Sequence, residues 1–268
     1  MSTLAETVSD SIVITRRNLI KVKRVPDLIV GATLAPIMFV VLFRYVLGGA
    51  INLPPGISYA EFLLPGIFAQ TVVFGSTITG ASLADDMQKG LIDRFRSLPM
   101  SRSAVLIGRT VADLGLNLIS IAVMAVTGLL VGWRINSSIA EAAGGFLILL
   151  VFAYAISWLM AMVGLLVRTP EVVNNASFIV IFPITFVANT FVPLESFPAV
   201  LRGFAQWNPV STVTEAAREL FGNIPAGMPE PEAWSLQHPV VYTLLWAAAI
   251  LAVFVPLSVR AYLRTASR

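Results

Sequence analysis

Residues 141–167 read EAAGGFLILLVFAYAISWLMAMVGLLV, and only the first of them, Glu141, carries a charge. A helix needs roughly 20 apolar residues to cross a hydrocarbon core about 30 Å thick, and this run is long enough. Five more apolar stretches lie along the 268-residue chain. The sequence therefore predicts an all-α integral membrane protein, one transmembrane domain over residues 1–268, with six transmembrane helices at residues 28–48, 61–84, 104–132, 141–167, 172–193 and 239–259.

The composition supports this fold class and excludes several kinds of function. Charged residues make up 12% of the chain and the mean hydropathy is +0.83, whereas about a quarter of the residues in a soluble domain are charged. The chain has no cysteine and a single histidine, His238, so it offers no thiolate nucleophile and a poor set of metal ligands. We expect no catalytic residues, no bound cofactor or metal, and no nucleic acid partner.

The basic residues predict the orientation, because cytoplasmic loops of membrane proteins retain Lys and Arg. Six spans put both termini on one side, and fourteen Lys and Arg residues fall there against four on the other side. We therefore expect cytoplasmic termini and a cytoplasmic loop at residues 85–103. The four residues on the outer side are Arg44, Arg134, Arg202 and Arg218.

The N-terminal segment, residues 1–27, has the pattern of an interfacial helix. One helical face carries apolar side chains and the basic residues lie elsewhere, which favours a helix on the inner leaflet in contact with anionic lipid. A disordered basic tail is the alternative. The face consists of Val8, Ile12, Thr15, Leu19 and Val22.

Residues 193–238 form the longest stretch outside the predicted spans, on the extracytoplasmic side. Pro198 and Pro209 stand where helices begin, and Gly222 stands where a helix would end. In the second of these helices one face is apolar, while Glu215, Arg218 and Glu219 occupy other faces. We expect outer re-entrant helices between spans five and six; a solvated linker is the alternative.

The loop between spans two and three is unusually charged. Residues 85–99 predict one short amphipathic cytoplasmic helix that Pro99 ends. Its acids begin the helix, where the dipole favours them, and Asp85 precedes Lys89 by one turn. Such a helix is a docking surface for a partner or for the membrane. Its apolar face consists of Met87, Leu91, Phe95 and Leu98.

Two stretches carry a resemblance to a known family. Residues 90–114, GLIDRFRSLPMSRSAVLIGRTVADL, resemble the segment between spans two and three in membrane subunits of type 2 ABC exporters, especially the daunorubicin-resistance branch. Residues 191–220, FVPLESFPAVLRGFAQWNPVSTVTEAAREL, are similar to the family's re-entrant outer element. The resemblance covers essentially the whole chain.

This resemblance implies a permease of the bacterial cytoplasmic (inner) membrane that exports a hydrophobic or amphipathic compound, such as a drug, polyketide or lipid. The predicted cytoplasmic helix at residues 85–99 would be the coupling helix, which docks on an ATPase subunit present in two copies. A second permease, identical or paralogous, would complete the exporter. Many relatives outside this branch carry an Arg-Glu pair just before the loop glycine, where this chain has Met87, Gln88 and Lys89. The implied coupling residues are Asp85, Asp86, Lys89, Leu91, Asp93, Arg94, Phe95 and Arg96.

The energy source must be a separate chain if export is driven by ATP. The sequence contains no Gly-x-x-x-x-Gly-Lys-Ser/Thr loop, which is the element that cradles nucleotide phosphates. We therefore expect ATP and Mg²⁺ on the partner subunit.

Few polar side chains lie deep inside the predicted spans. Asp113 is the only carboxylate well inside one, and Arg109 one turn earlier predicts an ion pair near the cytoplasmic interface. Three amides, Asn174, Asn175 and Asn189, fall in span five on both sides of Pro183. They would bond to neighbouring helices or line the substrate path, because amides in lipid need partners.

Two other classes of function stay open. An ion-coupled secondary transporter would use ionisable residues deep in its spans, which makes Asp113 its candidate proton site. A non-transporting membrane scaffold would use the charged loop only for docking. The substrate and the choice between homodimer and heterodimer cannot be read from the sequence.

Overall fold

The computed structural model describes residues 4–24, 27–49, 51, 56, 58–96, 100–101, 103–167, 169–224 and 231–264, and within these residues every regular element is helical. In chain order the elements are α1 (Leu4–Arg24), α2 (Asp27–Leu42), the π-helical turn η1 (Phe43–Leu47), α3 (Tyr59–Gln88), α4 (Leu91–Arg96), α5 (Ala104–Leu130), α6 (Ile139–Leu166), α7 (Pro170–Phe186), the 3₁₀ turn η2 (Leu194–Ser196), α8 (Ala199–Trp207), α9 (Pro209–Phe221), α10 (Trp234–Gln237) and α11 (Pro239–Arg264).

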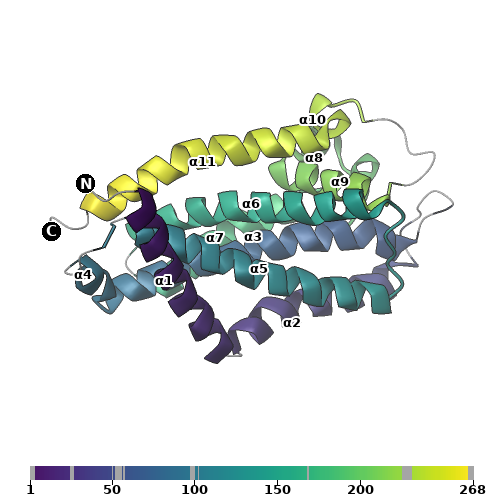
Figure 1. The fold of residues 1–268 in the computed structure, drawn as a ribbon. Coiled ribbons are helices and arrows are strands. Elements are labelled where there is room, and N and C mark those ends of the chain that lie inside the picture. The colour runs from purple at the N-terminus through teal and green to yellow at the C-terminus, as the bar shows by residue number, and fades with distance from the viewer. Residues whose placement is uncertain are drawn as a thin grey trace.

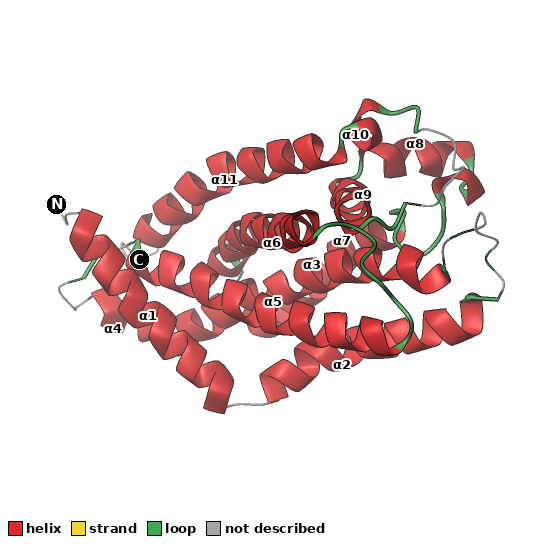
Figure 2. Cartoon of the chain, turned by 45° about the vertical axis from the view of Figure 1, so that its right-hand side comes forward, coloured by secondary structure: helices red, strands yellow, loops and turns green. Residues whose placement is uncertain are grey.

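The long helices run side by side and give the molecule two distinct ends (Figures 1 and 2). At one end, named here the α4 end, lie α1, α4 and the last turns of α11, so the described chain starts and finishes at the same end of the bundle (Figure 1). At the other, the α9 end, lie α8, α9 and α10. This common placement agrees with an even number of membrane crossings.

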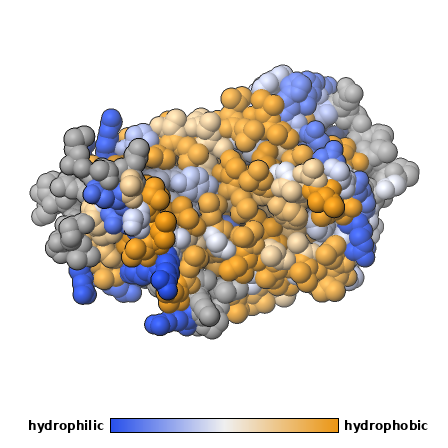
Figure 3. Space-filling model, viewed as in Figure 1, coloured by the Kyte–Doolittle hydropathy of each residue, from blue (hydrophilic) through white to orange (hydrophobic). Residues whose placement is uncertain are grey.

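Four described helices are long and apolar enough to cross a membrane: α3, α5, α6 and α11. In position and length they match the predicted spans two, three, four and six. The predicted spans one and five coincide with two shorter apolar helices, at Thr33–Val46 and in α7. Figure 3 shows a broad hydrophobic belt between these ends, with hydrophilic residues gathered at each end.

Helix α3 forms the centre of the bundle because it packs against α2, α5, α6, α7 and α9. Its contact with α6 depends on small residues. A Cβ atom at Gly164 would lie 2.3 Å from the Gly80 carbonyl oxygen, so the two backbones are in direct contact. One turn away, Ser76 Oγ donates a hydrogen bond to the Ala153 carbonyl at 3.1 Å. These contacts fix the crossing of the two helices.

The starts of α3 and α6 are capped in the same way at the α9 end. Ser58 and Glu61 form a capping box on α3, and Ser138 and Glu141 form one on α6. In addition, Asn136 Nδ2 donates to Glu61 Oε1 at 2.9 Å, which ties the α5–α6 connection to the first turn of α3. Acidic residues near these span starts therefore act as helix caps.

The boundary of the fifth predicted span is wrong. Residues 172–193 were predicted to form one span, but α7 ends at Phe186. The physical reason lies in Asn208, whose Nδ2 donates to the carbonyls of Ile184 at 2.7 Å and Val187 at 2.9 Å. One carbonyl of the last turn of α7 and that of its C-cap residue thereby gain a side-chain partner, which stabilises the end of the helix at this position.

Helices α8 and α9 begin where the sequence predicts, and α9 also ends there. Pro198 is the N-cap of α8 and Pro209 is the first residue of α9. Gly222 ends α9 with φ of 68°, a left-handed conformation that glycine adopts without strain.

Candidate functional site

The predicted amphipathic helix over residues 85–99 is interrupted. Asp85 and Asp86 belong to the last turn of α3, which ends at Gln88, and a separate helix, α4, begins at Leu91. The break occurs at Gly90, whose φ of 66° is incompatible with a continuous right-handed helix. The acids therefore lie at a helix C-terminus instead of the predicted N-terminus. There the dipole disfavours them.

Lys89 offsets part of that unfavourable charge. Its Nζ lies 2.8 Å from Asp85 Oδ2, as the i, i+4 spacing predicts, and this hydrogen bond raises the pKa of Lys89. The Lys89 side chain is 62% exposed. Asp86 is buried, with 7% of its surface exposed. Of these three predicted coupling residues, Lys89 is therefore the one presented most openly to a partner.

Helix α4 rests on the ends of the long helices. Ile92 is the most buried residue of α4 among those whose side chains are described, and Leu91 and Phe95 are half-buried. The cluster beneath α4 contains residues of α3, α5, α6 and α11. Arg94 is exposed. The side chains of Asp93 and Arg96, and residues 97–99 with Leu98 and Pro99, lie outside the described part of the chain.

Helix α1 holds this region from the side. The guanidinium carbon of Arg17 lies 4.8 Å from the centre of the Phe95 ring, a cation–π contact. Asp10 Oδ2 accepts a hydrogen bond at 2.8 Å from the backbone N–H of Ser101, just after α4. The α4 segment is thus attached to α1 as well as to the bundle.

The packing of α1 explains how it reaches that position. Its buried face, which carries Ser11, Ile14 and Asn18, packs against α5, where a Cβ at Gly108 would lie 2.6 Å from Ile14 Cβ. Val8 and Ile12, from the predicted apolar face, are 58% and 62% exposed. Thr15, from the same face, instead donates to the Gly108 carbonyl at 3.2 Å. The helix therefore presents apolar side chains outward, as an interfacial helix would.

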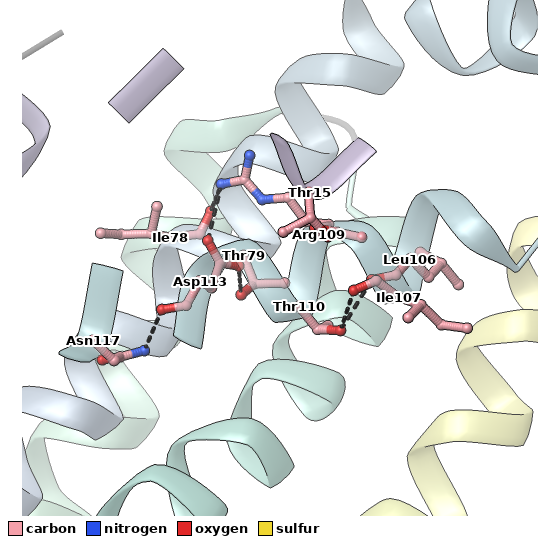
Figure 4. A network of polar contacts seen from close by, with 10 residues as sticks. Thr15, Ile78, Thr79, Leu106, Ile107, Arg109, Thr110, Asp113 and Asn117 are labelled. Carbon is pink, nitrogen blue, oxygen red and sulfur yellow. Dashed lines mark hydrogen bonds and ion pairs between the residues drawn. The ribbon is translucent and has the colours of Figure 1, made fainter. Parts of the chain in front are cut away.

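Asp113 pairs with Arg109, as predicted. Arg109 Nη2 lies 3.3 Å from Asp113 Oδ1, and both side chains are buried (Figure 4). Thr79 of α3 donates a hydrogen bond to the other carboxylate oxygen, and Arg109 also donates to the Ile78 carbonyl at 3.4 Å. The carboxylate thus joins α5 to α3 through polar bonds inside the bundle.

The two amides near the start of α7 face away from the rest of the chain. Asn174 and Asn175 are exposed, and no hydrogen bond joins either side chain to another described residue. Large apolar side chains on the same helix are also exposed, including Phe178 at 55% and Ile179 at 71%. This face combines unpaired amides with apolar surface.

Asn189 behaves differently, because it lies beyond the end of α7. Its Nδ2 donates to Glu215 Oε2 on α9 at 2.8 Å, and its backbone N–H donates to Ser211 Oγ at 3.3 Å. The structure therefore brings Asn189 to α9 and separates it from Asn174 and Asn175, which lie toward the opposite end of α7.

The sequence interpretation missed Arg218, which was predicted to occupy a polar face of its helix. The residue is 1% exposed and its guanidinium lies 3.7 Å from the centre of the Phe62 ring. It donates to the carbonyls of Phe62 at 3.0 Å and Asn189 at 2.6 Å, and pairs with Glu215 at 3.1 Å. The one local signal was the Glu215–Arg218 spacing of three residues.

The comparison with known families agrees with this arrangement. A family model described as ABC-2 type transporter matches residues 10–221, from α1 to the end of α9. The chain belongs to the ABC-2 type transporter family. This finding confirms the predicted resemblance, and together with the apolar helices it makes the chain a multi-pass membrane protein.

Individual relatives support the same assignment. This ABC-2 chain is 34% identical to the daunorubicin resistance ABC transporter permease protein DrrB1 of Streptomyces coeruleorubidus, over 92% of this chain and 83% of that protein. It is 27% identical to the probable doxorubicin resistance ABC transporter permease protein DrrC of Mycobacterium tuberculosis, over 86% and 80% of the two chains. A putative transport permease, ycf38 of Porphyra purpurea, is 25% identical over 78% and 72%.

Proposed function

We propose that this ABC-2 chain is the non-catalytic membrane subunit of an ATP-driven exporter and receives mechanical force at α4 from a separate ATPase. The observation that carries this proposal is the seating of α4. It lies on a cluster formed by α3, α5, α6 and α11 and is attached to α1 through Arg17 and Asp10. A close-packed interior transmits displacement instead of absorbing it.

The proposed topology has six crossings with the α4 end in the cytoplasm. Helix α2 and the turn η1 together span residues 27–47 and α7 has 17 residues, about 31 Å and 26 Å at 1.5 Å per residue. Both lengths approach a hydrocarbon core of about 30 Å. Most Lys and Arg residues belong to the α4 end, as expected of a cytoplasmic face. The α8–α9 segment would then enter the membrane from the outer side.

The proposed assembly contains two such subunits and two ATPases, which hold ATP and Mg²⁺. The exposed face of α7 supports a second membrane subunit, identical or paralogous, because Asn174 and Asn175 need hydrogen-bond partners in lipid. The names of two relatives specify drug resistance, which supports a hydrophobic or amphipathic cargo. The outward face of α1 would contact inner-leaflet lipid.

The first test is purification of the tagged chain from its native bacterial membrane, followed by mass spectrometry. We expect a stoichiometric soluble subunit with a phosphate-binding loop. Phe95→Ala should abolish this association while membrane insertion, measured by fluorescence-detected size exclusion, is retained, because the ring anchors α4 beneath Arg17. Charge reversal at Asp93 and Arg96 should have the same effect.

Phe204→Ala is the matched control, because Phe204 lies on α8 at the other end and is 55% exposed. It should leave ATPase association unchanged. Retained association in all the α4 variants would contradict docking at α4. Ion-driven transport by the reconstituted chain without ATP would favour a secondary transporter, and ATPase binding without transport would favour a scaffold.

A further inference from the structure

A groove lies between α1 and α5 at the α4 end. Its volume is about 450 Å³, which falls within the range of ligand sites, roughly 300–1,000 Å³. The lining residues are Ile12, Thr15, Arg16, Leu19 and Ile20 of α1 and Val111 of α5. Most of them are aliphatic, so the groove suits an apolar ligand.

The crossing of α1 over α5 places this groove beside the hydrophobic belt. Helix α1 lies across the long helices and not along them (Figures 1 and 2), and it contacts α5 at Gly108. Val111 follows Gly108 by nearly one turn in the direction of the α9 end. The groove therefore lies on the flank of α1 that faces the belt (Figure 3), where the acyl chains of one leaflet begin beside an interfacial helix.

Hydrogen bonding and close packing define the floor of the groove. Thr15 Oγ1 lies 2.7 Å from the Ser11 carbonyl oxygen and 3.2 Å from that of Gly108. A Cβ at Gly115 would lie 2.9 Å from Leu19 Cδ2, so Leu19 packs closely over α5. The hydroxyl of Thr15 thus has acceptors already, and the floor favours a hydrocarbon chain.

The apolar side chains that line the groove are exposed. Ile12 is 62% exposed, Ile20 is 41% exposed and Val111 is 38% exposed. Apolar surface gathered in one place marks an interaction site on a protein. Because this surface faces the hydrophobic belt, a lipid chain is the occupant that its position favours.

Arg16 adds a positive charge to this apolar lining. It is exposed and forms no ion pair with any residue in the described part of the chain, whereas its neighbour Arg17 lies over the Phe95 ring. The aliphatic stem of an arginine can lie along an apolar chain while its guanidinium reaches outward. Guanidinium groups bind phosphate through two parallel hydrogen bonds. Arg16 is therefore suited to a lipid phosphate.

The charge along α1 favours one class of headgroup. The second half of the helix, residues 15–24, contains basic residues and no acidic one; the basic residues are Arg16, Arg17, Lys21, Lys23 and Arg24. Of the acids in the first half, Asp10 is bonded to the backbone N–H of Ser101. Clustered basic residues at a bilayer surface attract anionic lipids. An anionic headgroup therefore matches this half of α1 better than a zwitterionic one.

We propose that the groove binds one anionic glycerophospholipid, with an acyl chain against Ile12, Ile20 and Val111 and the phosphate on the Arg16 guanidinium. The site lies in the leaflet at the α4 end, which is the inner leaflet in the proposed topology. The lipid is a structural component and not the transported compound, so this site goes beyond the proposed function. By filling the space between α1 and α5, it stabilises the helix to which the α4 segment is attached.

The test uses the full chain in a non-ionic detergent, where no charged bilayer attracts lipid to the protein as a whole. The probes are palmitoyl-oleoyl phosphatidylglycerol and the phosphatidylcholine with the same chains, added at equal concentration. We expect native mass spectrometry to show one phosphatidylglycerol retained in preference to phosphatidylcholine. Arg16→Gln should lower its occupancy about fivefold, the factor expected from one basic residue beside an anionic headgroup.

Arg24→Gln is the matched control, because Arg24 is exposed on the same helix and does not line the groove. It removes the same charge and should retain the lipid. Val111→Trp fills the groove without a change of charge and should also lower the occupancy. Its control is Val126→Trp, at a position of α5 that is 58% exposed and lies away from the groove.

Three outcomes would overturn the proposal: equal retention of the two lipids, equal loss in Arg16→Gln and Arg24→Gln, or an unchanged occupancy in Val111→Trp. Equal loss in the two arginine variants would indicate general attraction to a basic helix. Fluorescence-detected size exclusion checks that all four variants fold. Since no ATPase takes part in these measurements, their failure would leave the exporter proposal in place, and failure of the ATPase pull-down would leave the lipid site in place.

Discussion

The two ends of the bundle handle charge in opposite ways. At the α4 end, the Lys89 side chain is 62% exposed and pairs with the half-buried Asp85. At the α9 end, Arg218 is turned inward and bonded to carbonyls of two other segments. The exposed ammonium group of Lys89 is accessible from outside, whereas the inward charge of Arg218 fixes the chain around it. This difference separates a surface suited to docking from a segment held in place by internal bonds.

The largest effect should come from removing the inward charge. Arg218→Met leaves Glu215 without its ion-pair partner and deprives the carbonyls of Phe62 and Asn189 of a donor. Loss of one partner from a buried pair costs about 3–5 kcal/mol. We expect severe loss of folded protein in fluorescence-detected size exclusion and a clearly lower Tm for any that remains.

Arg202→Met provides the control at the same end, because Arg202 is exposed and bonds only to backbone carbonyls nearby in sequence. Its Tm should stay close to that of the unaltered chain. Equal Tm values for the two variants would show that burial of Arg218 does not distinguish the α9 end.

An intermediate loss of thermal stability should follow from separating α3 and α6 at their contact in the middle of the bundle. A Cβ at Gly80 would lie 2.6 Å from the Met160 carbonyl oxygen, so Gly80→Ala should force α3 and α6 apart. Overpacking of this kind costs about 1–3 kcal/mol. The readout is the shift in thermal unfolding monitored in detergent. Gly31→Ala is the control, since nothing lies within 4 Å of that added atom; a similar loss in both would refute the close contact.

The smallest effect on folding should come from the outward charge. Lys89→Gln removes the ion pair with Asp85, but Lys89 itself is exposed, and ion pairs at the surface contribute little to stability. We expect an unchanged Tm together with weaker ATPase association in a pull-down. A Tm loss comparable with that of Arg218→Met would erase the contrast between the two ends.

Sequence patterns predicted the features that depend on neighbours along the chain. The Arg109–Asp113 pair, the Asp85–Lys89 pair and the helix boundary at Gly222 all follow from spacings within one or two turns. The long apolar helices were predicted for the same reason, because hydrophobic length is a property of one segment.

The features that the sequence did not reveal depend on distant partners or on a single backbone angle. Burial of Arg218 requires Phe62, which lies 156 residues away in sequence, and the end of α7 requires Asn208. The interruption before α4 depends on the positive φ of Gly90. Periodicity alone could not separate a continuous helix over residues 85–98 from two helices joined at that glycine.

The capped start of α3 gives this helix the geometry of a lever. Ser58, Glu61 and Asn136 anchor one extremity, while α4 rests near the other. With 30 residues, α3 is about 45 Å long at 1.5 Å per residue, so pivoting by roughly 5° about the anchored extremity moves the opposite tip by about 4 Å. A small rotation of α3 would therefore displace α4, the proposed binding surface for the ATPase, by several ångströms.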